Sequence, residues 1–198
     1  MSTKYILVGG YARKAPDGGK AFCDEFVKGF GSNGPVRILD CLFARPKAVW
    51  EQTLAEDKDF FVAHLPGKSL EIELADPRSF LEQIAQADCV YLKGGDTPTM
   101  KSALLSFGRE ALQKVFVGKT VAGSSAGTAV LSVADYDLDY FKIDEGLGLV
   151  PVKTLCHYRS DYNAPRVDWD KVDSEMEKYR EAERIPLFKL REGEYKVF

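Results

Sequence analysis

The sequence predicts an α/β protein, a three-layer sandwich in which helices cover both faces of a mostly parallel central sheet. Short apolar runs alternate along the chain with segments whose apolar residues recur at helical spacing. Most of these runs are continuously apolar, which is typical of parallel strands buried on both faces. The chain has 198 residues, of which 45% are hydrophobic and 29% charged, an ordinary globular composition. We therefore expect one domain that spans residues 1–198.

The first half of the chain supplies most of the expected strands and helices. Apolar runs predict strands at residues 5–8, 36–43, 60–63, 70–74 and 89–92. Helical spacing of apolar residues predicts helices through residues 22–30, 49–54, 80–85, 100–104 and 112–115. Pro46 and Pro98 lie near the starts of two of these helices, where a proline costs no helical hydrogen bond.

The C-terminal third is more polar. Residues 134–140 carry acids at alternating positions, which would share one face of a strand. Residues 169–183 predict a charged helix with a solvated face. Two apolar runs, 186–190 and 195–198, are joined across residues 191–194 and predict a terminal β-hairpin.

The most informative stretch is a G-x-S-x-G pattern formed by Gly123, Ser125 and Gly127. It follows a short apolar run and precedes a helix-compatible run of small residues. A serine at such a strand-to-helix turn is strained and exposed, and its neighbours must be small because strand and helix crowd together there. The free N–H groups of the following helix point back towards the serine and could hold an oxyanion. The pattern predicts a nucleophile.

Composition excludes several other classes of function. A net charge of −3 and a pI near 5.5 give no basic surface for nucleic acid. No apolar run is long enough to span a membrane and no signal peptide is recognisable, so we expect a cytoplasmic protein without a membrane partner. The four cysteines are scattered and only two histidines exist, so we expect no metal site and no cofactor. Cys41 and Cys89 lie in or beside apolar runs and are expected to be buried free thiols.

An activated serine needs a histidine base, and the base needs a carboxylate. His157 follows Ser125 in the chain after the acidic segment 134–140, which gives the order serine, acid, histidine. His64 is the alternative base, but it lies far upstream in a polar segment that contains proline and glycine.

With these residues assembled, the chain resembles the peptidase family S51 of aspartyl dipeptidase (peptidase E) and cyanophycinase. The resemblance rests on the segments 90–97, 121–127, 146–149 leading into 157–158, and 190–193. It implies a class I glutamine amidotransferase-like, flavodoxin-like fold and a serine hydrolase. A glutamine amidotransferase itself is not expected, because that chemistry uses a cysteine where this elbow has serine.

Carried over residue by residue, the resemblance makes Ser125 the nucleophile and His157 the base. Asp135 aligns best with the family's acid, and Asp137 and Asp139 remain alternatives. The oxyanion hole would use the backbone N–H groups of Gly95 and Ala126.

The resemblance also implies a small peptide substrate with an N-terminal aspartate, whose carboxylate an arginine can bind bidentately. Arg166 and Arg159, close after His157, are the candidates, and Asp96 and Thr97 are expected to hold the glycine turn or the substrate amine. We expect a monomer or a homodimer. Two other functions stay open: an esterase or other acyl hydrolase using the same elbow, and a catalytically silent ligand-binding protein.

Overall fold

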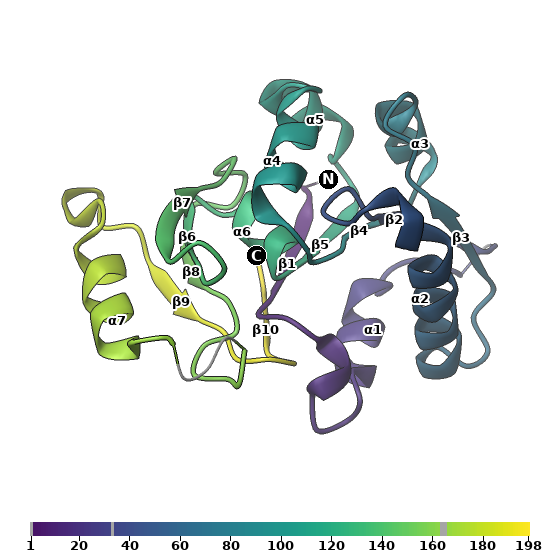
Figure 1. The fold of residues 1–198 in the computed structure, drawn as a ribbon. Coiled ribbons are helices and arrows are strands. Elements are labelled where there is room, and N and C mark those ends of the chain that lie inside the picture. Colours follow the sequence, from purple (N-terminus) through teal and green to yellow (C-terminus); the bar gives the residue numbers. More distant parts are fainter. Residues whose placement is uncertain (1, 33, 163–165) are drawn as a thin grey trace.

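The computed structural model describes residues 2–32, 34–162 and 166–198, which form two β-sheets with helices packed against them (Figure 1). The larger sheet has six strands in the order β10-β1-β5-β4-β2-β3. Its strands are β1 (Lys4–Val8), β2 (Val36–Cys41), β3 (Leu70–Leu74), β4 (Cys89–Leu92), β5 (Thr120–Ser124) and β10 (Tyr195–Val197). All neighbouring pairs in it are parallel except β10, which runs antiparallel to β1. The predicted α/β fold with a mostly parallel sheet is confirmed.

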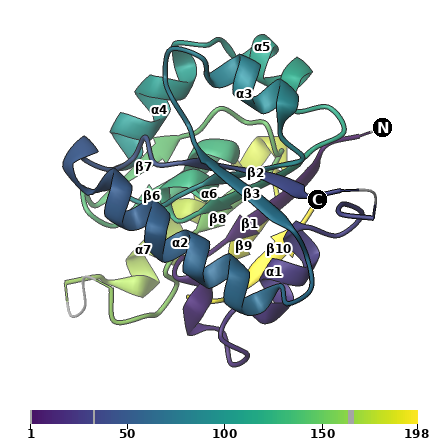
Figure 2. The same ribbon diagram turned by 90° about the vertical axis from the view of Figure 1, so that its right-hand side faces the viewer.

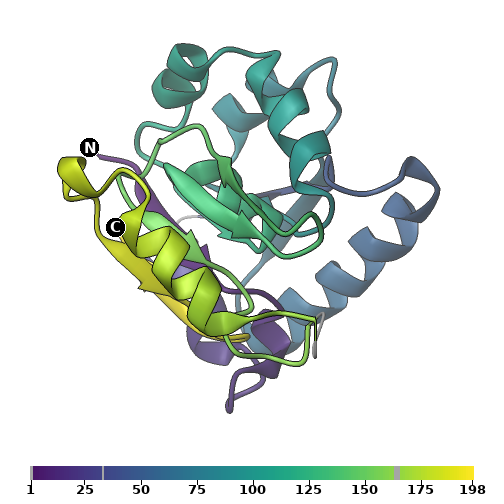
Figure 3. The same cartoon turned by 60° about the vertical axis from the view of Figure 1, so that its left-hand side comes forward.

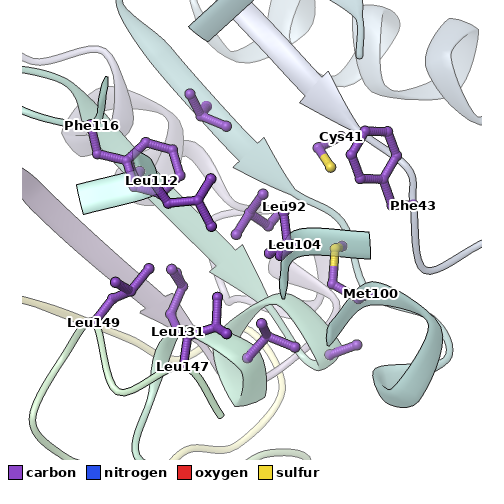
Figure 4. Close-up of a cluster of buried hydrophobic side chains, with 14 of the residues drawn as sticks. Cys41, Phe43, Leu92, Met100, Leu104, Leu112, Phe116, Leu131, Leu147 and Leu149 are labelled. Atoms are coloured by element: carbon purple, nitrogen blue, oxygen red, sulfur yellow. The ribbon is translucent and has the colours of Figure 1, made fainter. Parts of the chain in front are cut away.

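Helices cover both faces of this sheet, as Figure 2 shows from one side. One face packs against α1 (Lys20–Phe26) and α2 (Trp50–His64) through an aromatic cluster. The other face carries α3 (Phe80–Gln86), α4 (Thr97–Leu105), α5 (Arg109–Val115) and α6 (Ala126–Leu131). Figure 4 shows part of this second core, where side chains from β4, α4, α5 and α6 meet. The three layers leave the carboxyl ends of the parallel strands open to a ligand.

A smaller sheet lies beside the first and has the strand order β7-β6-β8-β9. Its strands are β6 (Ala134–Asp137), β7 (Lys142–Glu145), β8 (Lys153–Leu155) and β9 (Leu187–Lys189). Helix α7 (Trp169–Lys178) packs on it through Val172 and Met176 (Figure 3). Three short 3₁₀ helices complete the described elements: η1 (Ala12–Lys14), η2 (Lys47–Val49) and η3 (Glu181–Glu183).

Two expected elements are wrong. Residues 60–63 are the last part of helix α2 and not a strand. Phe60 and Phe61 are both buried while Val62 is 61% exposed, and the buried positions of α2 recur at helical spacing. The terminal β-hairpin is also wrong, because β9 pairs with β8 in the small sheet whereas β10 pairs with β1 in the large one.

The cysteines and the helices of the described residues can be compared with what the composition predicts. The four cysteines are buried and free. No helix in the described ranges is long and apolar enough to cross a membrane.

Candidate active site

Ser125 lies between β5 and α6 with φ 51° and ψ −111°, a backbone conformation that residues other than glycine rarely adopt. The glycines on either side are needed for close packing. A Cβ at Gly123 would lie 2.4 Å from the backbone of Gly127, and one at Gly127 would lie 2.1 Å from the carbonyl oxygen of Leu92. The predicted strand–turn–helix elbow is therefore present.

Hydrogen bonds to β1 hold this elbow in place. The Ser125 N–H donates to the Val8 carbonyl over 3.1 Å. The buried Thr128 hydroxyl accepts the Val8 N–H at 2.9 Å and lies 2.7 Å from the carbonyl oxygen of Gly123, to which it can donate. The nucleophile is thus fixed to the centre of the large sheet.

The side chain of His157 reaches this serine. Its Nε2 lies 2.9 Å from Ser125 Oγ, within hydrogen-bonding distance. The backbone N–H of His157 donates to the Gly9 carbonyl at 2.7 Å. A Cβ at Gly10 would lie 2.3 Å from the imidazole Cε1 of His157. The glycine pair after β1 therefore leaves the space that the imidazole fills.

The carboxylate that contacts this histidine is Glu192. Its Oε1 lies 3.0 Å from His157 Nδ1, and Lys14 pairs with its other carboxylate oxygen. Glu192 lies in the turn before β10, and its side chain is only 10% exposed. Residues 190–193 contribute to the family resemblance, but their sequence pattern predicts only a hairpin turn.

The expected carboxylates lie elsewhere. Asp135 is the register partner of Thr154 in the β6–β8 pair and accepts the Thr154 hydroxyl at 2.5 Å. Burial raises the pKa of Asp135 to about 7. Asp137 accepts the N–H groups of Asp139 and Tyr140 in a tight turn, at 2.9 and 3.1 Å. Strand pairing and the turn engage these side chains, and the carboxylate at hydrogen-bonding distance from His157 Nδ1 is that of Glu192, not that of Asp135 as expected.

Aromatic rings enclose the imidazole. Tyr162 stacks on His157 with ring centroids 4.3 Å apart, and Tyr11 meets it edge-on at 5.4 Å. The Tyr162 hydroxyl donates to Asp139, which fixes this stacked ring to the turn after β6. Asp139 thus positions a ring beside His157.

Burial lowers the pKa of His157, and the hydrogen bond and charge of Glu192 oppose this shift without overcoming it. A histidine with a lowered pKa is neutral at pH 7 and can accept the Ser125 proton. The neutral form is favoured by folding, so protonation in acid costs both reactivity and stability.

We expect the labelling of Ser125 by a fluorophosphonate probe to slow as the pH falls through the His157 pKa. The midpoint should lie below the ordinary value of 6.5 because burial disfavours the imidazolium. Labelling rates measured across the acid and neutral range give this midpoint. A midpoint above the ordinary histidine value would contradict the assignment of His157 as the base.

The turn after β4 lies against the elbow. A Cβ at Gly94 would lie 3.1 Å from Ser125 Cβ, and one at Gly95 would lie 2.3 Å from the carbonyl oxygen of Ala44. Ala126 is the first residue of α6, so its N–H has no acceptor within the helix. These positions suit the expected oxyanion donors, Gly95 and Ala126.

Asp96 has a structural part in this turn. It caps α4 by accepting the Thr99 N–H at 2.9 Å, and it accepts the Tyr140 hydroxyl at 3.0 Å. Thr97 is the first residue of α4 and lies near Ser125 in a small cavity. The Asp96 side chain thus caps helix α4 directly after the glycine turn.

A cleft of about 560 Å³ opens over Ser125 and His157. Its charged lining residues include Arg13, Arg45, Glu56, Asp57, Lys93, Asp96 and Asp139. Arg159 and Arg166 are not among the described lining residues. Arg159 pairs with Asp170 and Asp173, and Arg166 lies over the Phe141 ring.

The alternative base and a metal site are not supported. His64, at the end of α2, places Nδ1 2.8 Å from the Phe60 carbonyl oxygen and does not line the cleft. Within the described ranges, no group of three histidine, cysteine, aspartate or glutamate residues is arranged to hold a metal ion.

Serine hydrolases are defined by a serine on such an elbow, hydrogen-bonded to a histidine whose other ring nitrogen contacts a carboxylate. The family model of peptidase family S51 matches residues 46–195. The chain therefore belongs to peptidase family S51, and it is a serine peptidase by class.

Solved structures show the same fold. A crystal structure of a peptidase from an acI-B1 Actinobacterium is 20% identical, with a TM-score of 0.65 over 100% of this chain and 84% of that one. A putative peptidase E protein from Listeria monocytogenes EGD-e is 16% identical, with a TM-score of 0.65 over 100% of this chain and 98% of that one. No curated protein matches the chain.

Proposed function

We propose that this peptidase is a dipeptidase that releases an N-terminal aspartate from small peptides through Ser125, His157 and Glu192. The observation that carries the proposal is the continuous chain of contacts from Ser125 Oγ through both imidazole nitrogens to Glu192 Oε1, at 2.9 and 3.0 Å. The resemblance to aspartyl dipeptidase supports the substrate class.

In the first step, His157 Nε2 accepts the Ser125 proton while Oγ attacks the scissile carbonyl carbon. Glu192 keeps the Nδ1–H tautomer in place and stabilises the imidazolium that forms. The N–H groups of Gly95 and Ala126 donate to the oxyanion. The imidazolium then protonates the leaving amine, and the acyl-enzyme forms.

In the second step, water attacks the acyl-enzyme and His157 accepts its proton. The tetrahedral intermediate collapses, the proton returns to Ser125 and the N-terminal residue leaves as a free acid. The size of the cleft, about 560 Å³, is within the range of small-molecule sites and suits a short peptide.

Hydrolysis of a matched dipeptide series tests the substrate class. We expect Asp-Leu to be cleaved with a kcat/KM at least about tenfold above that of Asn-Leu and Gly-Leu, because a buried charge-assisted contact is worth that factor or more. A panel of p-nitrophenyl esters is the matched control. Ester hydrolysis without cleavage of any dipeptide would replace this proposal with an esterase.

A further inference from the structure

Basic side chains from three segments line the cleft: η1, the β2–α2 connection and the turn after β4. Arg13, Arg45 and Lys93 face Asp57 and Glu56 there. The cleft as a whole has three basic and four acidic residues among its described lining residues, so its binding preference depends on which of the cations are already paired.

Two of these cations are already paired. Lys93 and Arg13 both bond to Asp57, whose side chain is 1% exposed. Behind them, burial and the neighbouring Asp57 raise the pKa of Asp40 well above its usual range, so a second negative charge is disfavoured there. Lys93 and Arg13 thus compensate a buried acid within the protein.

Arg45 differs from them. Its Nε donates to the Gly94 carbonyl at 2.8 Å, and it has no ion pair with any residue that the structure describes. That hydrogen bond does not use the N–H groups on the two terminal nitrogens of Arg45. A half-buried guanidinium without a counter-ion loses hydration that only an anion can replace well.

The segment around Arg45 is held on several sides. Its carbonyl accepts the Trp50 indole N–H at 2.8 Å, and the Asp96 N–H donates to the Ala44 carbonyl at 2.8 Å. Gly94, whose carbonyl oxygen accepts the Arg45 Nε–H, lies against Ser125. The guanidinium is therefore held in the cleft that opens over the nucleophile before any substrate binds, as a specific contact requires.

We propose that Arg45 binds a carboxylate of the substrate beside Ser125 and so makes the peptidase selective for anionic peptides. This proposal rests on the proposed function for its substrate. It replaces Arg166 and Arg159, the cations expected from the sequence. The carboxylate is either the side chain of the N-terminal residue or the C-terminus of the dipeptide, and both give the same bidentate contact.

Binding to the Ser125→Ala protein, measured by calorimetry, tests this proposal without turnover. The probes are Asp-Leu, Asn-Leu and Asp-Leu-amide, the last two each lacking one carboxylate. Adding Arg45→Gln should weaken Asp-Leu binding about 10- to 100-fold, because charge-assisted hydrogen bonds are lost. Binding of the analogue without the contacted carboxylate should change less than about threefold.

The analogue that loses its dependence on Arg45 identifies the carboxylate: Asn-Leu points to the side chain and Asp-Leu-amide to the C-terminus. Equal weakening of all three probes would mean that Arg45 acts only through the Gly94 turn, and would overturn the proposal. So would a failure of all three to bind.

Lys47→Gln is the matched control, because it removes one charge from the same connection outside the cleft. It should leave all three affinities within about twofold, since an exposed charge is screened. An effect equal to that of Arg45→Gln would indicate a general field and contradict a direct contact. Failure of the proposed function is recognised separately, as Arg45-dependent binding without any dipeptide hydrolysis by the protein that retains Ser125.

Discussion

Ser125→Ala is expected to lower kcat for Asp-Leu by about 10⁴-fold or more, because the attacking oxygen is removed and only binding and the oxyanion donors remain. Fluorophosphonate labelling should disappear as well. The fold should survive, since alanine is smaller than serine and has no greater difficulty at φ 51°. Steady-state kinetics and a melting curve check both expectations.

Ser124→Ala is the matched control for this variant. It removes the hydroxyl of the neighbouring serine, which is buried at the end of β5. Its kcat should stay within about tenfold of the wild-type value, because that oxygen does not contact His157. If purified Ser125→Ala cleaved Asp-Leu as fast as wild type, the nucleophile would have to be sought elsewhere.

Glu192→Gln is expected to lower kcat by about 10³- to 10⁴-fold. The neutral amide can favour the wrong imidazole tautomer and cannot stabilise the imidazolium. The acid limb of the pH profile should also move to lower pH, because the charge of Glu192 raises the His157 pKa. Measuring kcat/KM against pH tests both effects.

Asp135→Asn separates the two candidate acids. Asp135 bonds to Thr154 in the small sheet, so its replacement should leave kcat within about tenfold of wild type. Melting temperatures show whether either variant is unfolded. A larger loss from Asp135→Asn than from Glu192→Gln would restore the acid that the chain order suggested.

Much of the fold could be predicted from the sequence because parallel strands buried on both faces need continuous apolar runs. The segments 36–43 and 89–92 are examples, and both contain strands of the large sheet. Phe60 and Phe61 misled the prediction because neighbouring aromatic residues suit a buried strand as well as a buried helix face. Only the wider spacing of buried positions along α2 distinguishes the two.

The pairing of β9 and β10 could not be deduced locally. The short turn at 191–194 is compatible with a hairpin, but pairing depends on which distant strand has a free edge. β1 offers such an edge to β10, and β8 offers one to β9. The prediction therefore identified both strands and failed on their partners.

The candidate site shows the same division between local and distant information. The Ser125 elbow is a local pattern, because the glycines two residues before and after the serine are needed where strand and helix pack closely. The partner of His157 is a distant contact: Glu192 follows it by 35 positions and comes from an unremarkable charged turn. Chain order favoured an acid between Ser125 and His157, although the fold sets no such order for these groups.

The position of Glu192 next to an edge strand has a consequence for synthesis. The proposed triad lacks its carboxylate until residue 192 has been added and β10 has docked beside β1. A growing chain can already contain the elbow and His157, yet it cannot orient the imidazole through Glu192. With the proposed triad, peptidase activity therefore requires that β10 has paired with β1.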